Sequence, residues 1–66
     1  MLTYKPLFKL LIDLNMKEKV LAQKAGISPA TIAKMKHDNA VISSTILAKI
    51  CIVLKCKFDD IMEIKL

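Results

Sequence analysis

The sequence predicts an all-α fold of five short helices in a single domain that spans residues 1–66. Apolar residues recur at helical spacing through most of the chain. The chain holds one glycine and two prolines. Gly26 and Pro29 stand within four residues of each other, and this spacing indicates a sharp break between two helices. At this length the chain forms one small core, which leaves a domain marginally stable on its own.

The first predicted helix begins at Thr3, whose hydroxyl can serve as the N-cap, and ends near Leu14. Pro6 lies within its first turn, where the missing N–H has no intrahelical partner to lose. The apolar face of this helix consists of Leu7, Phe8, Leu11 and Ile12. Asn15 can take the left-handed conformation that closes a helix. A second helix follows over residues 17–25, and its inner side holds Val20, Leu21 and Ala22.

The residues around Gly26 predict a helix-turn-helix. Gly26 follows the second helix at the position where the backbone needs a positive φ, and Ile27 can fold back onto that helix. Ser28 then caps a third helix, and Pro29 takes its first helical position. Small and apolar residues allow the two helices to cross closely, namely Ala22, Ile32 and Met35. The third helix is expected over residues 28–36.

After a polar loop, Ser43 or Ser44 can cap a fourth helix. Its core stripe consists of Ile46, Leu47, Ile50, Cys51 and Leu54. A last helical turn is expected over residues 58–61. Residues 62–66 alternate apolar and polar side chains, which favours a short C-terminal strand. This strand needs a partner, either residues 1–4 of the same chain or a second copy.

Cysteine usage and hydropathy predict a cytoplasmic protein. Cys51 and Cys56 lack metal-binding spacing, and His37 is the only histidine. Five residues apart in a helix, the two thiols are expected on different faces, as core residues in a reducing compartment. No apolar segment approaches the length that spans a bilayer, and no signal peptide is recognised. We therefore expect no metal, cofactor, membrane or small-molecule ligand.

The charge of the chain is concentrated in its body. The formal net charge is +5; residues 1–58 hold ten lysines and three acidic residues, whereas residues 59–66 hold one lysine and three acids. A basic domain of this kind is typical of proteins that bind a phosphate backbone, although a solvated surface gives the same balance. No nucleophile motif, paired carboxylates or glycine-rich phosphate loop is present, so an enzyme is not expected.

The stretch LAQKAGISPATIAKMK resembles the helix-turn-helix core of the phage repressor and Cro-type (XRE-like) family of bacterial regulators. The stretch SSTILAKICIVLKCKFDDIME is similar to the family's next helix and closing turn, and LFKLLIDLNM to its first helix. The resemblance implies a compact five-helix repressor-like bundle that binds double-stranded DNA and regulates transcription, in most cases as a repressor. It also implies that residues 28–36 enter the major groove.

Carried over by position, the resemblance implies base-facing roles for Pro29, Ala30 and Lys34. It implies contacts with phosphates or bases for Lys17, Ser28, Thr31, Lys36, Asn39 and Ser43. Each residue also has a structural interpretation: Ser28 as a cap, Pro29 as a helix start, and Lys34 as a solvated side chain. Relatives commonly carry a capping Ser or Thr where Lys17 stands and Gln where Glu18 stands. Glu18 would repel phosphate, and a carboxylate in the first turn of a helix is favourable to the helix dipole, so Glu18 is not assigned to DNA.

Two further expectations concern partners. A helix-turn-helix can also serve as a protein-interaction module without specific DNA binding, which is the alternative function. The apolar tail predicts a homodimer whose interface consists of Phe58, Ile61, Met62, Ile64 and Leu66. Such a dimer would set two recognition helices about 34 Å apart, matching half-sites one turn of DNA apart.

Overall fold

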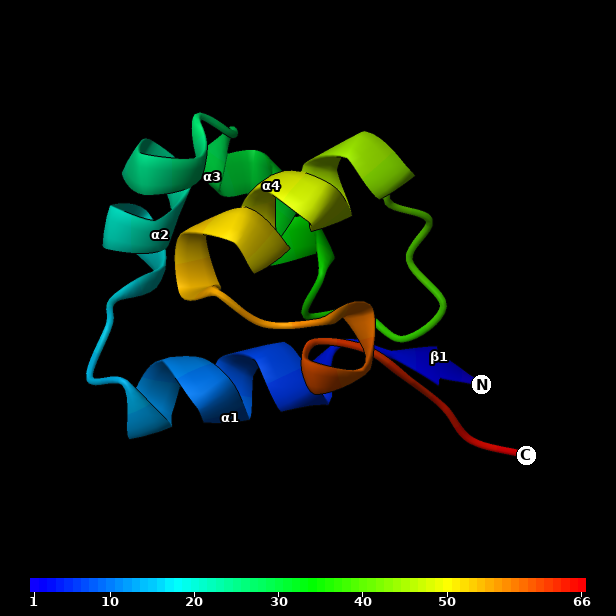
Figure 1. Ribbon diagram of the computed structural model, residues 1–66. Helices are drawn as coiled ribbons and strands as arrows, with labels where there is room; N and C mark the ends of the chain where they lie inside the picture. Colours follow the sequence, from blue (N-terminus) through cyan, green and yellow to red (C-terminus); the bar gives the residue numbers. More distant parts are fainter.

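The computed structural model describes all residues, 1–66, and contains four α-helices and one two-stranded sheet (Figure 1). In chain order the elements are β1 (Leu2–Thr3), α1 (Lys5–Asp13), α2 (Glu18–Ala25), α3 (Pro29–Lys34), α4 (Ser44–Leu54), the 3-10 turn η1 (Phe58–Asp60) and β2 (Glu63–Ile64). The helical class and the helix-turn-helix are as predicted. None of the helices combines the length and the apolar character needed to cross a bilayer.

The prediction of five helices is wrong, because the last one is a single 3-10 turn. The Lys57 N–H donates to the Asp60 carboxylate at 2.9 Å, and this bond between residues three positions apart caps the turn. The Ile61 N–H then donates to the carbonyl of Phe58 at 3.0 Å. Beyond Ile61 the chain leaves the turn and enters β2, so no further helical residues follow.

The core lies around α4, which runs between the α2–α3 pair and α1 in Figure 1. α2 packs against both α3 and α4, and η1 packs against α1 and α4. The largest fully buried side chains come from every part of the chain: Tyr4, Leu7, Leu21, Ile32, Met35, Ile50 and Ile61. Of the stripe predicted for α4, Leu47, Ile50 and Cys51 are buried, and Ile46 and Leu54 pack against them. Burial of these apolar side chains is the main force that holds the elements together.

Three helices end at a residue in the left-handed conformation: α1 at Asn15 (φ +54°), α2 at Gly26 (φ +66°) and α4 at Lys55 (φ +53°). Each end has the hydrogen bond typical of this termination, in which the next N–H reaches back to a carbonyl five residues earlier. Asn15 and Gly26 were predicted in this role. Lys55 was not, because lysine carries no signal for positive φ.

The left-handed Lys55 overturns the prediction for the two thiols. It turns the chain so that the Cys56 N–H donates to the Cys51 carbonyl at 3.0 Å. Cys56 therefore lies beside Cys51, close enough that each thiol affects the pKa of the other, and not on a different face of the helix. Both thiols are free, Cys51 buried and Cys56 half-buried. Helical spacing did not apply across this pair, since the helix ends between its members.

Helix starts follow the predicted caps in two cases. Ser28 Oγ accepts the N–H of Ala30 at 3.1 Å, and Ser43 Oγ accepts that of Ile46 at 3.3 Å. The N-cap of α1 is Tyr4 and not Thr3, but Thr3 Oγ1 accepts the N–H of Lys5, the first residue of α1, at 3.2 Å. Local hydroxyls thus accept N–H groups at the beginning of all three helices, although at α1 the hydroxyl belongs to the strand residue that precedes the N-cap.

The tail forms the predicted short strand, and its partner lies in the same chain. β2 pairs with β1 in antiparallel register, with Leu2 opposite Ile64. The terminal ammonium of Met1 donates to the Lys65 carbonyl at 2.6 Å, and the Lys65 N–H donates to the Met1 carbonyl at 2.8 Å. Both chain ends consequently lie side by side (Figure 1). We call β1, β2, η1 and the loop residue Asn39 that binds β1 the terminal seam.

Candidate nucleic-acid interface

The turn between α2 and α3 is determined by backbone conformation. The Gly26 N–H donates to the carbonyl of Gln23 at 3.3 Å, and the Ile27 N–H donates to that of Ala22 at 3.0 Å. A Cβ at Gly26 would meet no atom within 4 Å, so glycine is favoured here by its positive φ alone and not by lack of space. Ala22 is buried and Ile27 packs against the core. The turn therefore holds α3 packed against α2.

α3 has one buried and one exposed side. Ile32 and Met35 are each 1% exposed and anchor the helix in the core. The opposite side, which we call the outer face of α3, consists of exposed residues: Pro29, Ala30, Ala33 and Lys34. The three residues predicted to face bases all lie on it. Thr31 is half-buried at the edge of this face.

The helix is shorter than predicted at its C-terminal end. α3 ends at Lys34, and the Met35 N–H donates to carbonyls of both Thr31 and Ile32 at 3.1 Å, a tightened last turn. Lys36 therefore lies just beyond the helix and not within it. Burial of Met35 directs the chain back toward the core at this point.

Lys36 forms an ion pair that the sequence did not indicate. Its Nζ lies 3.0 Å from Oε1 of Glu18, the first residue of α2, and the two side chains are 53% and 42% exposed. Lys17, which precedes Glu18, is the N-cap of α2 but makes no side-chain capping bond, in line with its chemistry. Of these two lysines predicted to contact phosphate, Lys17 makes no ion pair, and Lys36 is paired with an internal carboxylate.

Asn39 and Ser43 have structural roles in the free protein. Asn39 takes a positive φ of +64°, its N–H donates to the Leu2 carbonyl at 2.7 Å, and its Oδ1 accepts the Leu2 N–H at 2.9 Å. The backbone N–H of Asn39 is therefore already hydrogen-bonded in the free protein. Ser43 is the exposed cap of α4 described above.

Sequence reasoning did not identify Tyr4 as a determinant of this loop. Its hydroxyl donates to the Ala40 carbonyl at 2.8 Å, and the ring is 2% exposed. Burial also raises the pKa of Tyr4 above its usual value. Tyr4 and Asn39 together tie the chain between α3 and α4 to β1.

The fold and this geometry agree with comparisons to known proteins. A family model described as the Cro/C1-type helix-turn-helix DNA-binding domain matches residues 7–65. The chain belongs to this family. It is also similar to a solved structure, the crystal structure of the transcriptional regulator VanUg, with 38% sequence identity and a TM-score of 0.78. That match covers 94% of this chain and 81% of the VanUg chain. No curated protein matches.

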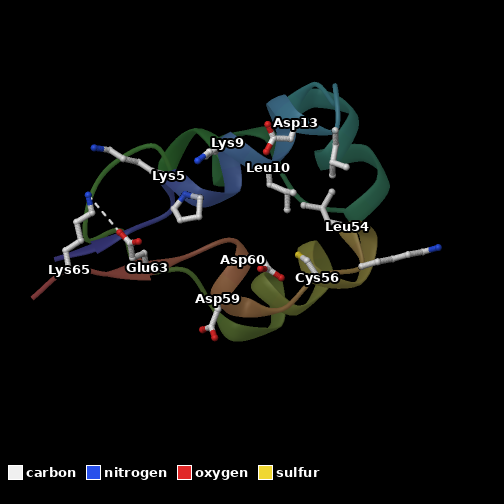
Figure 2. A pocket seen from close by; sticks show the side chains of 13 residues that line it. Lys5, Lys9, Leu10, Asp13, Leu54, Cys56, Asp59, Asp60, Glu63 and Lys65 are labelled. Carbon is white, nitrogen blue, oxygen red and sulfur yellow. Dashed lines mark ion pairs between the residues drawn. The ribbon is translucent and has the colours of Figure 1, made fainter.

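The Cro/C1-type domain also has a groove that lies away from α3. This groove of about 900 Å³ lies between α1 and the segment that follows α4, and none of its lining residues comes from α2 or α3. Figure 2 shows Lys5, Lys9 and Asp13 on the α1 side and Asp59, Asp60 and Glu63 on the other. Charges of both signs face this groove, so it does not present the uniformly basic surface that DNA attracts.

Cys56 lines the same groove (Figure 2). Burial, together with the neighbouring Cys51 and Asp60, raises the pKa of the Cys56 thiol to about 11. The reactive form of cysteine is the thiolate, which this thiol does not reach at neutral pH. Cys56 is accordingly a packing residue, and the outer face of α3 remains the candidate site.

Proposed function

We propose that this Cro/C1-type domain binds double-stranded DNA sequence-specifically and regulates transcription as a repressor, with residues 28–36 in the major groove. The observation that carries the proposal is the outer face of α3, where Pro29, Ala30 and Lys34 are exposed on a helix anchored by buried residues. In this docking mode the second helix of the helix-turn-helix contacts base edges and the first crosses the backbone. The proposed role is binding, without catalysis.

The outer face of α3 offers two kinds of base contact. Pro29 and Ala30 have no side-chain donor and fit the methyl group of thymine. Lys34 donates to the acceptors of a guanine edge, a role that arginine cannot take here because the chain contains none. Contacts that set the register on the duplex are proposed for Lys17, Ser28, Thr31, Lys36 and Ser43. Asn39 could add only its side-chain N–H, since its other polar groups bind Leu2.

Selection of bound fragments from random duplex DNA tests the proposal. We expect one recovered motif, and binding to it that weakens steeply as salt rises, because phosphate contacts release counterions. Recovery of no motif, with binding insensitive to salt, would contradict DNA recognition and favour the protein-interaction alternative. Placing the motif upstream of a reporter gene then measures repression directly.

Two lysine variants separate base contacts from phosphate contacts. Lys34→Ala should lower affinity for the selected motif by about 1–3 kcal/mol and relax the preference at one position. Lys17→Ala should weaken binding to all DNA sequences equally and reduce the slope of log affinity against log salt by about the value of one phosphate contact. Lys49→Ala, which removes an exposed lysine from α4, is the matched control and should change neither the preference nor the slope. Equal, sequence-independent losses in Lys34→Ala and Lys17→Ala would refute the assignment.

We also propose a homodimer that forms through the exposed apolar residues of the tail. Phe58 is 46% and Ile64 is 69% exposed, beside a hollow that Met62 also lines, and Leu66 is fully exposed. Ile61 no longer belongs to the predicted interface, because it is fully buried in the core. A dimer would bury this apolar surface and place two recognition helices on successive half-sites.

Sedimentation of two aspartate variants tests the dimer. Ile64→Asp should sediment as a monomer and lose most of its affinity for a two-half-site operator. Ile12→Asp places the same charge at an equally exposed isoleucine of α1 and should remain a dimer. If the Ile12→Asp variant sedimented as a monomer and the Ile64→Asp variant as a dimer, the interface would lie at α1 instead.

A further inference from the structure

The ion pair between Glu18 and Lys36 joins the beginning of α2 to the residues just after α3. The charged atoms are 3.0 Å apart, yet both side chains are about half exposed. Pairs in such contact with water add on the order of 0–1 kcal/mol to stability. The carboxylate also lies in the first turn of α2, where it is favourable to the helix dipole. Neither contribution involves DNA, whereas the ion pair also changes the charge that Lys36 can offer to a phosphate.

Glu18 stands beside the surface proposed for DNA. It lines a shallow hollow together with Lys19 of α2 and with Pro29 and Ile32 of α3. Pro29 is the first residue of the outer face of α3, so the carboxylate borders the base-facing residues directly. Within α2 and α3 Glu18 is the only acidic residue. One negative charge therefore interrupts an otherwise basic helix pair and neutralises Lys36, which lies just beyond α3.

We infer that Glu18 acts as an internal substitute for a DNA phosphate, which occupies Lys36 in the free protein and lowers the affinity for DNA. This inference rests on the proposed function. A backbone phosphate must displace the Glu18 carboxylate before it can pair with Lys36. The exchange replaces one ion pair by another, so Lys36 contributes less than a free lysine would. Glu18 thereby sets the strength of binding without reading any base.

The inference predicts a gain of binding on removal of the acid. Glu18→Gln frees Lys36, keeps the side-chain shape and should strengthen binding about threefold to tenfold at low salt. The slope of log affinity against log salt should steepen by about 0.9, the value of one additional phosphate contact. Both changes should occur on the selected motif and on a random duplex alike, because the freed Lys36 contacts the DNA phosphate backbone and not a base.

A double-mutant cycle measured by fluorescence anisotropy tests the inference on full-length protein. Glu18→Gln is compared in the wild-type background and in Lys36→Ala, with thermal unfolding to confirm that each variant folds. We expect most of the gain to vanish in Lys36→Ala. A gain of the same size without Lys36 would mean simple repulsion of phosphate by Glu18, and would overturn the exchange.

Asp13→Asn is the charge control. It also removes one exposed carboxylate and changes the net charge equally, but it lies in α1, on the groove that no residue of α2 or α3 lines, and outside the proposed dimer surface. We expect no strengthening from it, and an equal gain would show a general charge effect and overturn the inference. If wild type binds and Glu18→Gln binds no better, the inference fails while DNA binding stands. If no variant binds DNA, the proposed function itself fails.

Discussion

The helix-turn-helix and the terminal seam of this domain are held together over very different distances along the chain. In the turn, the hydrogen bonds from Gly26, Ile27 and Ala30 reach partners two to five residues away. In the seam, Met1 binds Lys65 across 64 positions, and Leu2 binds Asn39 across 37. The turn can form within a short segment, whereas the seam closes only when distant parts of the chain are already folded. The seam should therefore respond most strongly to changes in packing.

The largest expected effect comes from the buried residue that joins the seam to the core. Ile61 is fully buried, so Ile61→Ala should lower the free energy of unfolding by about 2–5 kcal/mol through lost contacts and a cavity. Ile12 of α1, which lies outside the proposed dimer surface, is 78% exposed, and Ile12→Ala should stay within about 0.5 kcal/mol. Urea unfolding followed by circular dichroism measures both. Losses of equal size would show that the seam is not anchored through Ile61.

The stability of the helix-turn-helix should depend on the backbone conformation at Gly26 more than on packing around it. Gly26→Ala should cost about 1–2 kcal/mol, because an alanine at φ +66° is strained although no atom blocks its Cβ. Lys55 has nearly the same conformation without being glycine, so Lys55→Gly should stabilise the protein by up to about 1 kcal/mol. Urea midpoints of the two variants should shift in opposite directions. A shift in the same direction would contradict the role given to positive φ.

A comparison of Asn39 with Asn15 separates the contribution of backbone conformation to stability from that of a long-range side-chain hydrogen bond. Both have positive φ, but only the Asn39 side chain binds a distant partner, the Leu2 N–H. Asn39→Ala should therefore cost about 1 kcal/mol more than Asn15→Ala, the value of that hydrogen bond. DNA affinity of the folded Asn39→Ala protein should change less than twofold. Equal stabilities of the two variants would contradict the role given to the bond between Asn39 and Leu2. A large loss of DNA affinity would instead support Asn39 as a phosphate contact.

The smallest effect concerns Cys56, whose pKa rises from 9.0 to about 11 in the folded protein. Because the unfolded chain releases this proton first, the contribution of the thiol to stability is constant below about pH 8 and is lost as pH rises through 9–11. With a discount for partial exposure, the loss near pH 10 is about 0.5–1 kcal/mol. Unfolding of Cys56→Ala should show a shallower decline over this range. Parallel profiles for the two proteins would contradict the assignment.

Much of the proposed interface could be predicted because its signals are local. Ser28 as cap, Gly26 with positive φ and the inward Ile32 and Met35 are each defined by their neighbours within one or two helical turns. The partner of Lys36 could not be predicted, since Glu18 lies on another helix. The number of helices was wrong for a different reason: apolar spacing indicated a helical turn at residues 58–61, but this segment is a 3-10 turn in which the Asp60 carboxylate accepts the Lys57 N–H.

The helix-turn-helix could be predicted from its own residues, because caps, left-handed helix ends and apolar spacing act through contacts between near neighbours. The extended tail followed in the same way from its alternating apolar and polar residues. Packing around α4, by contrast, selects β1 of the same chain as the partner of β2, buries Ile61, and brings Cys56 back onto Cys51 and Lys36 to Glu18. These partners are distant in sequence, or lie on either side of a helix end that no residue type indicates, so local patterns do not reveal them.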